Sequence, residues 1–145
     1  MADRDEAEIG DLDAILGLHI RMAYGAVRRH FGETFAGLGL SQKQVSVLWL
    51  AADHPGIGQA ELARRLQMDR ATAMAIVHAL EKRGLLQRQP VKEDARRIGL
   101  SISMAGTALL AQAKQAIAAH EAWLKRRFTP EEIDRLTEYL RRIHD

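Results

Sequence analysis

The sequence predicts a mostly helical fold with one small β-hairpin, and three features of its 145 residues support this prediction. Only three prolines interrupt a chain rich in Ala, Leu, Arg and Glu, which favour helix. Apolar residues recur at steps of three or four over most of the length. Between residues 86 and 102 the spacing changes to alternation around a charged tip, which is typical of two paired strands. The length suits a single domain, residues 1–145.

The N-terminal part predicts one long amphipathic helix over about residues 13–36. Its apolar positions, three or four residues apart, are Leu16, Ile20, Ala23, Val27, Phe31 and Phe35. Leu18, Met22 and Ala26 widen this stripe sideways. A face this wide predicts contact with more than one neighbour, such as a core and a partner chain.

A capping box marks the start of the second helix. Ser41 lies three residues before Gln44, and the helix is expected to end near His54. The residues expected to face inward are Val45, Leu48 and Trp49.

Two short helices joined by a tight turn follow. The first covers about residues 58–66, Asp69 is a suitable N-cap for the second, and Gly84 follows at its end. The inward positions of the second are Ala73, Ile76, Val77 and Leu80. This arrangement predicts a helix-turn-helix, with the hairpin after it forming a wing.

Two further helices are expected after the hairpin. Ser103 caps a helix of about 24 residues, and Thr129 followed by Pro130 starts a final helix. The expected inner face of the long helix comprises Leu109, Ala113, Ala116, Ile117, Trp123 and Leu124. That of the final helix comprises Ile133, Leu136, Leu140 and Ile143.

The charge distribution indicates a polyanionic partner. Residues 62–100 hold nine basic and four acidic side chains, whereas residues 1–13 hold six acids and predict an acidic, frayed head. The chain has no cysteine, which excludes disulfides, thiolate metal sites and cysteine-based peroxide sensing. It also has no apolar run of membrane-spanning length and no basic start of a signal peptide, so we expect it in the cytoplasm.

Three stretches within about residues 10–144 resemble the MarR family of bacterial regulators. They are residues 80–88 (LEKRGLLQR), residues 94–97 (DARR) and residues 102–106 (ISMAG). The resemblance implies a winged helix-turn-helix over about residues 41–103, with dimerisation helices over about residues 10–36 and 104–145. It also implies a triangular homodimer with two recognition helices in successive major grooves of a near-palindromic operator, and repression that a ligand relieves.

The expected DNA contacts come from the recognition helix and the wing. On the helix they are Arg70, Ala71, Thr72, Met74 and Ala75, and on the wing they are Arg88, Lys92, Asp94, Arg96 and Arg97. An arginine suits the narrow minor groove, whereas Asp94, by resemblance, braces an arginine through an ion pair. Related regulators often carry a Thr-Arg pair where this chain has Met74 and Ala75, so base readout must rely on Arg70, Thr72, thymine methyl contacts and DNA shape. Gln59 is either a phosphate contact or an ordinary exposed glutamine.

The resemblance also implies a small-molecule effector, for which the sequence offers His19, Arg21 and Trp49. Together these would give an anionic aromatic ligand a cation, a hydrogen bond and an aromatic wall. Residues 17–23 resemble regulators that sense aromatic acids through their coenzyme A thioesters. Alternatively, Trp49 packs in the core and His19 lies on a helix surface or an interface.

Other classes of function have less support in the sequence. No catalytic residues are indicated, because no Ser/His/Asp spacing, glycine-rich phosphate loop or carboxylate pair occurs. The six histidines are scattered, so neither a metal site nor a cofactor is expected. A DNA-binding dimer without an effector and a protein-interaction module stay open as alternatives, and the second would have no need of a basic wing.

Overall fold

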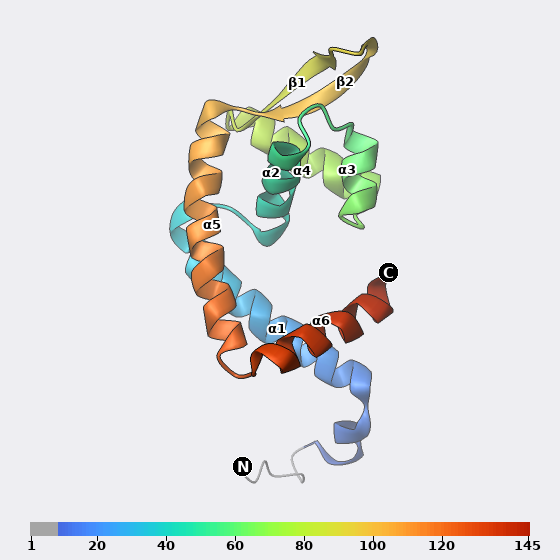
Figure 1. Ribbon diagram of the computed structural model, residues 1–145, viewed down its shortest axis with the longest axis vertical. Helices are drawn as coiled ribbons and strands as arrows, with labels where there is room; N and C mark the ends of the chain where they lie inside the picture. The colour runs from blue at the N-terminus through green and yellow to red at the C-terminus, as the bar shows by residue number, and fades with distance from the viewer. Residues whose placement is uncertain (1–8) are drawn as a thin grey trace.

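The computed structural model describes residues 9–145 and places ten elements along the chain (Figure 1). The acidic stretch at residues 1–8, part of the head that we expect to be frayed, lies outside the described residues. The elements are η1 (Gly10–Ala14), α1 (Leu16–Phe35), η2 (Ala36–Leu38), α2 (Gln42–Asp53), α3 (Gln59–Arg65), α4 (Arg70–Lys82), β1 (Leu86–Val91), β2 (Asp94–Ile102), α5 (Met104–Lys125) and α6 (Pro130–His144). Among the described helices, none has the length and apolarity that a membrane crossing requires.

Residues 40–103, here called the winged lobe, fold around their own hydrophobic core. The fully buried side chains include Val47, Leu48, Leu62, Val77 and Leu80, drawn from α2, α3 and α4. The C-terminal end of α1 adds Phe31 and Phe35, and the first half of α5 adds Leu110 and Ala113. The predicted helix-turn-helix and the predicted inward faces of α2 and α4 are therefore confirmed, with Trp49 and Ile76 only half-buried.

The hairpin pairs β1 with β2 in antiparallel register, from Leu86 opposite Ile102 to Pro90 opposite Ile98. Ile57, in the loop after α2, forms a bridge to Leu100 and joins the hairpin to the helices. Gly99 allows this approach, because a Cβ atom there would lie 2.4 Å from the carbonyl oxygen of Gly56. The wing is thus anchored at its base and free at its tip.

Four of the predicted helix starts are confirmed by their hydrogen bonds. Ser41 and Thr129 each form a capping box with the residue three positions later, whereas Asp69 and Ser103 each accept a backbone N–H bond from the first turn. Each bond satisfies a donor that the start of a helix would otherwise leave free.

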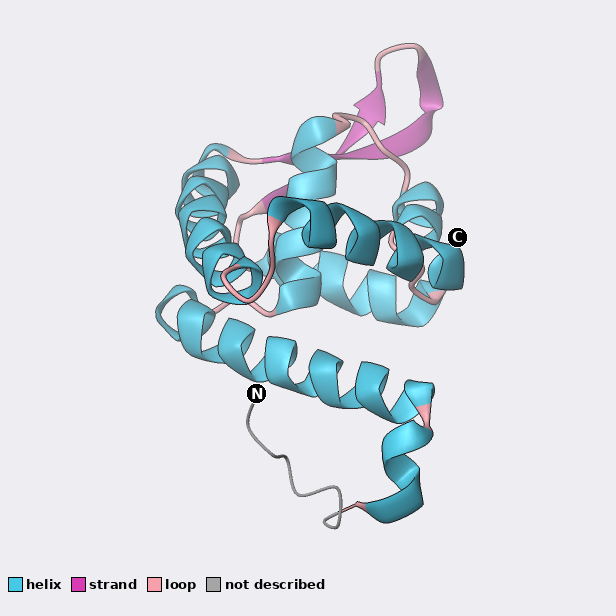
Figure 2. Cartoon of the chain, turned by 60° about the horizontal axis from the view of Figure 1, so that its bottom comes forward, coloured by secondary structure: helices cyan, strands magenta, loops and turns pink. Residues whose placement is uncertain are grey.

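The arm, here defined as residues 10–35 (η1, α1 and Ile15 between them) and α6, lies at the end of α5 away from the wing, and the C-terminal end of α6 turns back toward the winged lobe (Figures 1 and 2). No residue of α6 is buried. The exposed large apolar side chains of the arm are Leu12, Ile15, Leu16, Ile20, Met22, Tyr24, Leu136, Tyr139, Leu140 and Ile143. At the end of α6, Gln67 Nε2 of the lobe donates to the carbonyl oxygen of His144 over 2.9 Å.

The start of the first helix was predicted too early, and the inner face of α5 was predicted incompletely. The first helix does not begin near residue 13, because Ile15 is extended (φ −89°, ψ 107°) and separates η1 from α1. On α5 the predicted Ala113 is buried and the other predicted inner residues are half-buried, whereas the buried Leu110 and His120 were not predicted. Since α5 contacts α1 as well as α2, its buried ridge is rotated from the one that apolarity alone indicates.

Candidate nucleic-acid interface

The exposed face of α4 holds most of the predicted recognition residues. Arg70, Ala71, Met74 and Ala75 are exposed, and more than half of the Met74 surface is open to solvent. The opposite face, with Ala73, Val77 and Leu80, is fully buried. The helix therefore has one face buried in the core and one exposed face, which carries both polar and apolar side chains and is available to a partner.

Thr72 differs from its predicted neighbours because its side chain is half-buried and occupied. Its hydroxyl donates to one carboxylate oxygen of Asp69 over 2.8 Å, and its backbone N–H donates to the other over 2.7 Å. These bonds, the backbone one first, lower the pKa of Asp69. Because the depressed pKa favours the charged cap, its stabilisation is present at neutral pH and is lost as the pH falls through that pKa. The structure thus gives Thr72 a role in holding the start of α4.

Gln59, at the first position of α3, lies beside α4. Together with Ala60, Arg70 and Met74 it lines a shallow hollow of about 240 Å³ on the surface of the winged lobe. The structure therefore brings Gln59 together with two predicted base-reading residues, although they lie eleven or more positions later in the chain.

The tip of the wing contains an irregularity that displays its arginines. Opposite Val91 lies Asp94, whereas opposite Pro90 lies Ile98, so residues 95–97 have no partner in β1. A bulge of this kind turns side chains away from the regular pattern of a strand. It contains Arg96 and Arg97, both exposed, and Lys92 is exposed in the turn before it.

Asp94 supports this bulge through the backbone. One of its carboxylate oxygens accepts the N–H of Arg96 over 3.0 Å. In the part of the chain that the structure describes, Asp94 forms no ion pair with an arginine. The brace that the resemblance implied therefore reaches Arg96 through its amide, and leaves its guanidinium available.

Arg88 connects the wing to the recognition helix. Its Nε lies 2.7 Å from Oε1 of Glu81, near the end of α4, and both side chains are partly exposed. The sequence prediction missed Glu81, because residues seven apart across a turn match none of the spacings that indicate a pair within a helix or strand. The pair links the two elements that the DNA-binding prediction requires to act together.

Glu61, an acidic side chain near the basic surface, is paired with arginines. Glu61 of α3 lies 2.8 Å from Arg65 and 3.5 Å from Arg64. The hydrogen bond and charge of Arg65 lower the pKa of Glu61 most, and Arg97 of β2 adds a smaller effect. Arg97 of the wing is therefore near enough to α3 for its charge to act on Glu61. Within the described residues, no group of three His, Asp or Glu side chains could hold a metal ion.

The predicted effector residues lie in different surroundings. At the start of α1, His19 Nε2 is 2.6 Å from the carbonyl oxygen of Asp13, and Arg21 is exposed. Trp49 is half-buried on α2 under the ammonium of Lys114, which lies 4.7 Å from the ring centroid. This placement is consistent with a histidine on a helix surface for His19 and with a packing role for Trp49.

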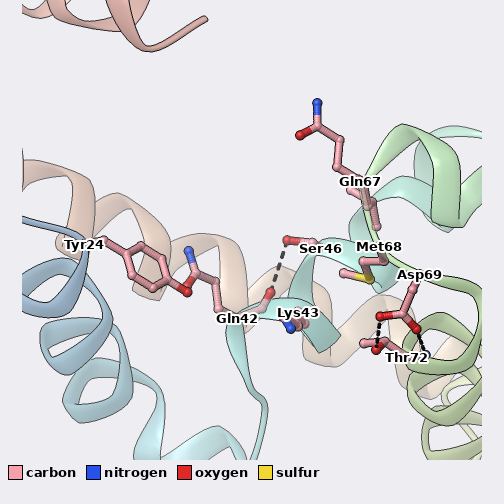
Figure 3. A pocket seen from close by; sticks show the side chains of 9 residues that line it. Tyr24, Gln42, Lys43, Ser46, Gln67, Met68, Asp69 and Thr72 are labelled. Atoms are coloured by element: carbon pink, nitrogen blue, oxygen red, sulfur yellow. Dashed lines mark hydrogen bonds between the residues drawn. The ribbon is translucent and has the colours of Figure 1, made fainter. Parts of the chain in front are cut away.

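A different group of side chains surrounds a hollow of about 300 Å³ between α1, the start of α2 and the turn between α3 and α4 (Figure 3). None of His19, Arg21 and Trp49 lines it. Its lining residues are Tyr24, Gln42, Lys43, Ser46, Leu66, Gln67, Met68, Asp69 and Thr72. The hollow thus touches both the arm and the first turn of the recognition helix, and the sequence prediction missed it because its walls come from distant segments.

Known proteins similar to this chain share the arrangement. The model of the MarR family matches residues 40–98. A protein of Thauera aromatica, named as a transcriptional regulatory protein for its hcr operon, is 30% identical over 99% of this chain and 88% of its own length. A transcriptional repressor, CouR, solved with a 23-mer DNA duplex, is 33% identical with a TM-score of 0.88, covering 95% of this chain and 98% of the other. The chain belongs to the MarR family.

As a MarR-family chain it is a transcriptional regulator rather than a member of an enzyme family. A second structure, CouR from Rhodococcus jostii RHA1 bound to p-coumaroyl-CoA, shares the fold with a TM-score of 0.85. It is 23% identical and covers 92% of this chain and 94% of its own. The predicted winged helix-turn-helix fold is confirmed.

Proposed function

We propose that this MarR-family regulator is a dimeric, sequence-specific repressor that places α4 in the major groove of operator DNA and the wing in the adjacent minor groove. The observation that carries the proposal is that the winged lobe presents both surfaces. The exposed face of α4 and the bulged arginines of β2 extend from one lobe, and the Glu81–Arg88 pair ties them together. A partner that contacts both must be long and polyanionic, as a duplex is.

The proposed contacts divide by chemistry. Arg96 and Arg97 enter the minor groove, where the narrow geometry raises the negative potential, and Lys92 contacts phosphate. Arg70 donates to a guanine edge, whereas Met74, Ala71 and Ala75 offer apolar contact to thymine methyl groups. Gln59 binds the backbone or a base edge next to Arg70, and Thr72 and Asp94 hold the two reading elements in shape.

The exposed apolar surface of the arm supports the homodimer. Leu136, Leu140 and Ile143 share one face of α6 and remain open to solvent, together with Leu16 and Ile20 on α1. A surface of this kind gains free energy when a second copy covers it. A two-fold dimer would present two α4 helices about 34–36 Å apart to successive major grooves, which is the spacing that a near-palindromic operator provides.

We also propose that an aromatic acid or its coenzyme A thioester releases the repressor from DNA. Two observations support this class of effector: the 33% identity to a CouR repressor, and the p-coumaroyl-CoA in the structure of the protein of that name from Rhodococcus jostii. The hollow of Figure 3 supplies Tyr24 and Lys43 beside the turn before α4. A ligand there would act by binding the DNA-competent and incompetent dimers unequally. His19, Arg21 and Trp49 remain proposed contacts.

The DNA-binding proposal is tested with Arg96→Ala and, as a matched control, Arg126→Ala, whose exposed arginine lies in the loop after α5. We expect Arg96→Ala to remain dimeric and to bind operator duplex more weakly, by about 1–3 kcal/mol, with a shallower salt dependence. Arg126→Ala should match the parent. Equal affinity of both variants for operator would remove the wing from the mechanism, and salt-independent binding would favour a protein-interaction module.

The effector proposal is tested by titrating the complex with a panel of aromatic acids and their thioesters. Release by one compound, weakened in Lys43→Ala or in Trp49→Phe, would identify the pocket that acts. A complex that survives the whole panel would leave a DNA-binding dimer without an effector of this class.

A further inference from the structure

A pair of histidines, His120 buried and His30 half-buried, joins α1 to α5. The Nδ1 atoms of His30 and His120 lie 2.7 Å apart, and His120 is only 5% exposed. In the described part of the chain this is the one side-chain hydrogen bond between the two helices. The pair therefore lies at the connection between the arm and the helix that carries it.

Aromatic rings enclose the pair. The ring of His30 stacks on Trp123 with centroids 3.9 Å apart and planes 4° apart, and Phe31 meets His120 edge to face. Phe31 in turn stacks on Phe35, which is 1% exposed within the core. Separation of the two histidines would thus disturb the aromatic column that fixes α1 to the lobe.

The short distance limits how many protons the pair can hold. Two facing Nδ1 atoms form a hydrogen bond only when one carries a proton and the other offers a lone pair. A first added proton can bind the outer nitrogen of the donor ring, because the bond between the Nδ1 atoms then survives. A second would have to occupy the accepting Nδ1 and place two N–H groups and two positive charges against each other. The second protonation is therefore incompatible with the closed contact.

Neighbouring groups do little to relieve this conflict. Burial first, and then repulsion by His30, lower the pKa of His120, whereas the nearby charge of Glu121 on α5 raises it by less. On α1 the hydroxyl oxygen of Thr34 lies 3.4 Å from His30 Nδ1, and beyond α5 the guanidinium of Arg127 lies over the Trp123 ring. Among the described residues neither ring forms an ion pair with a carboxylate, and α2 and η2, which also contact α5, contribute no charged partner.

We propose that the His30–His120 pair is a proton-sensitive latch between α1 and α5, which opens in mildly acidic solution and loosens the arm from the winged lobe. In the unfolded chain a histidine takes up its proton near pH 6.5, whereas the folded pair resists the second proton until lower pH. The unfolded state therefore binds more protons below about pH 6.5, and the stability contributed by the pair is lost as the pH falls. A consequence for operator binding rests on the proposed function, because the arm would set the spacing of the two α4 helices.

The latch is tested by replacing His120 with asparagine, whose amide lies near the position of Nδ1 but does not titrate. The matched control is His54→Asn, an exposed histidine at the end of α2. Thermal unfolding of the parent and both variants is followed by calorimetry from pH 7.5 to 5.5. At pH 5.5 the pair should raise the unfolding equilibrium constant of the parent by up to roughly tenfold, since one pH unit below the ordinary value is a factor of ten.

We expect this pH-dependent loss in the parent and in His54→Asn, and a clearly smaller loss in His120→Asn. An identical pH dependence in all three would overturn the latch. If His120→Asn does not fold, NMR titration of the histidine rings in the parent decides. Two separate steps, the lower well below pH 6.5, support the latch, whereas independent titration of both rings near pH 6.5 overturns it.

Operator affinity is measured in parallel, in a His78→Asn background that removes the exposed histidine of α4 from the DNA surface. The latch predicts weaker specific binding at pH 5.8 than at pH 7.5, with the difference reduced by His120→Asn. Acid-stable affinity with an acid-sensitive unfolding curve would limit the latch to stability and overturn its link to DNA. Absence of specific binding at pH 7.5 would contradict the proposed function and leave the calorimetric test intact.

Discussion

The winged lobe and the arm differ in how completely each packs its own apolar side chains. In the lobe, Leu48, Leu62 and Leu80 are wholly buried, and every element contributes to one core. In the arm, α6 buries no residue, and α1 is buried only at its C-terminal end, at Phe31 and Phe35. Both regions carry similar apolar spacing in the sequence, yet only the lobe satisfies it within one chain.

This difference suggests different roles for the two regions, DNA contact for the lobe and association for the arm. The lobe is a rigid unit whose shape is set by internal packing, as a surface that reads DNA requires. In the proposed homodimer, a second copy would cover the exposed apolar side chains of the arm. The same substitution should therefore have different consequences in the two regions.

The largest effect is expected in the core of the lobe. Leu48→Ala removes a side chain with no exposed surface and should lower the free energy of unfolding by about 2–5 kcal/mol, through lost burial and a residual cavity. Urea denaturation at one fixed protein concentration measures this change. A loss below about 1 kcal/mol would mean that the core can collapse around the cavity.

Glycine replacements compare the two regions with one chemical change. Gly99→Ala places a Cβ atom 2.4 Å from a backbone oxygen and should cost about 1–3 kcal/mol, whereas Gly32→Ala on α1 meets nothing within 4 Å. Because alanine favours helix, Gly32→Ala should stabilise the protein by roughly 0.5–1 kcal/mol. Thermal unfolding gives both signs, and destabilisation by both variants would show that this face of α1 is closely covered.

A substitution in the arm should change the dissociation constant of the dimer rather than the free energy of unfolding of the lobe. Leu140→Ala removes an exposed apolar side chain of α6 and should raise the dimer dissociation constant by about tenfold, or ~1.4 kcal/mol. Glu138→Ala, on the opposite face of the same helix, is the control. Sedimentation velocity over a concentration series measures both, and indistinguishable dissociation constants would argue against α6 as the interface.

The smallest destabilisation is expected at the helix starts. Ser41→Ala removes the cap of α2 and should lower the free energy of unfolding by about 1 kcal/mol. Thr129→Ala removes an equivalent cap from α6, and its cost should appear mainly in dimer dissociation. If Ser41→Ala changed mainly dimer dissociation and Thr129→Ala mainly the free energy of unfolding, the proposed difference between the lobe and the arm would be contradicted.

Local signals in the sequence were sufficient for most of the fold. Capping residues at Ser41, Asp69, Ser103 and Thr129 fixed four helix starts, because each cap bonds a backbone group only three residues away. The start of α1 was placed too early, since no such signal distinguishes η1 from the helix after it. His120 was missed as a buried residue, because its burial depends on His30, ninety positions earlier.

Part of the candidate DNA surface could be predicted from the sequence. The exposed residues of α4 follow from the helical period once the inward face is known. The bond from the Thr72 hydroxyl to the predicted N-cap Asp69 was not predicted, although it is local. The pairing of Glu81 with Arg88 and the bulge at Arg96 depend on how the hairpin sits after α4, and they were not predicted either. The hollow lined by α1, α2 and the turn after α3 was not predicted, because residues so far apart in the sequence leave no local pattern.

Sequence-specific DNA binding is tested by a gel shift of the purified protein on the DNA upstream of its own gene, with random duplex as competitor, over a range of salt concentrations. We expect a specific complex that resists random DNA and weakens steeply as salt rises, because several phosphates lose their counterions on binding. Absence of any shift, or equal affinity for both duplexes, would contradict it.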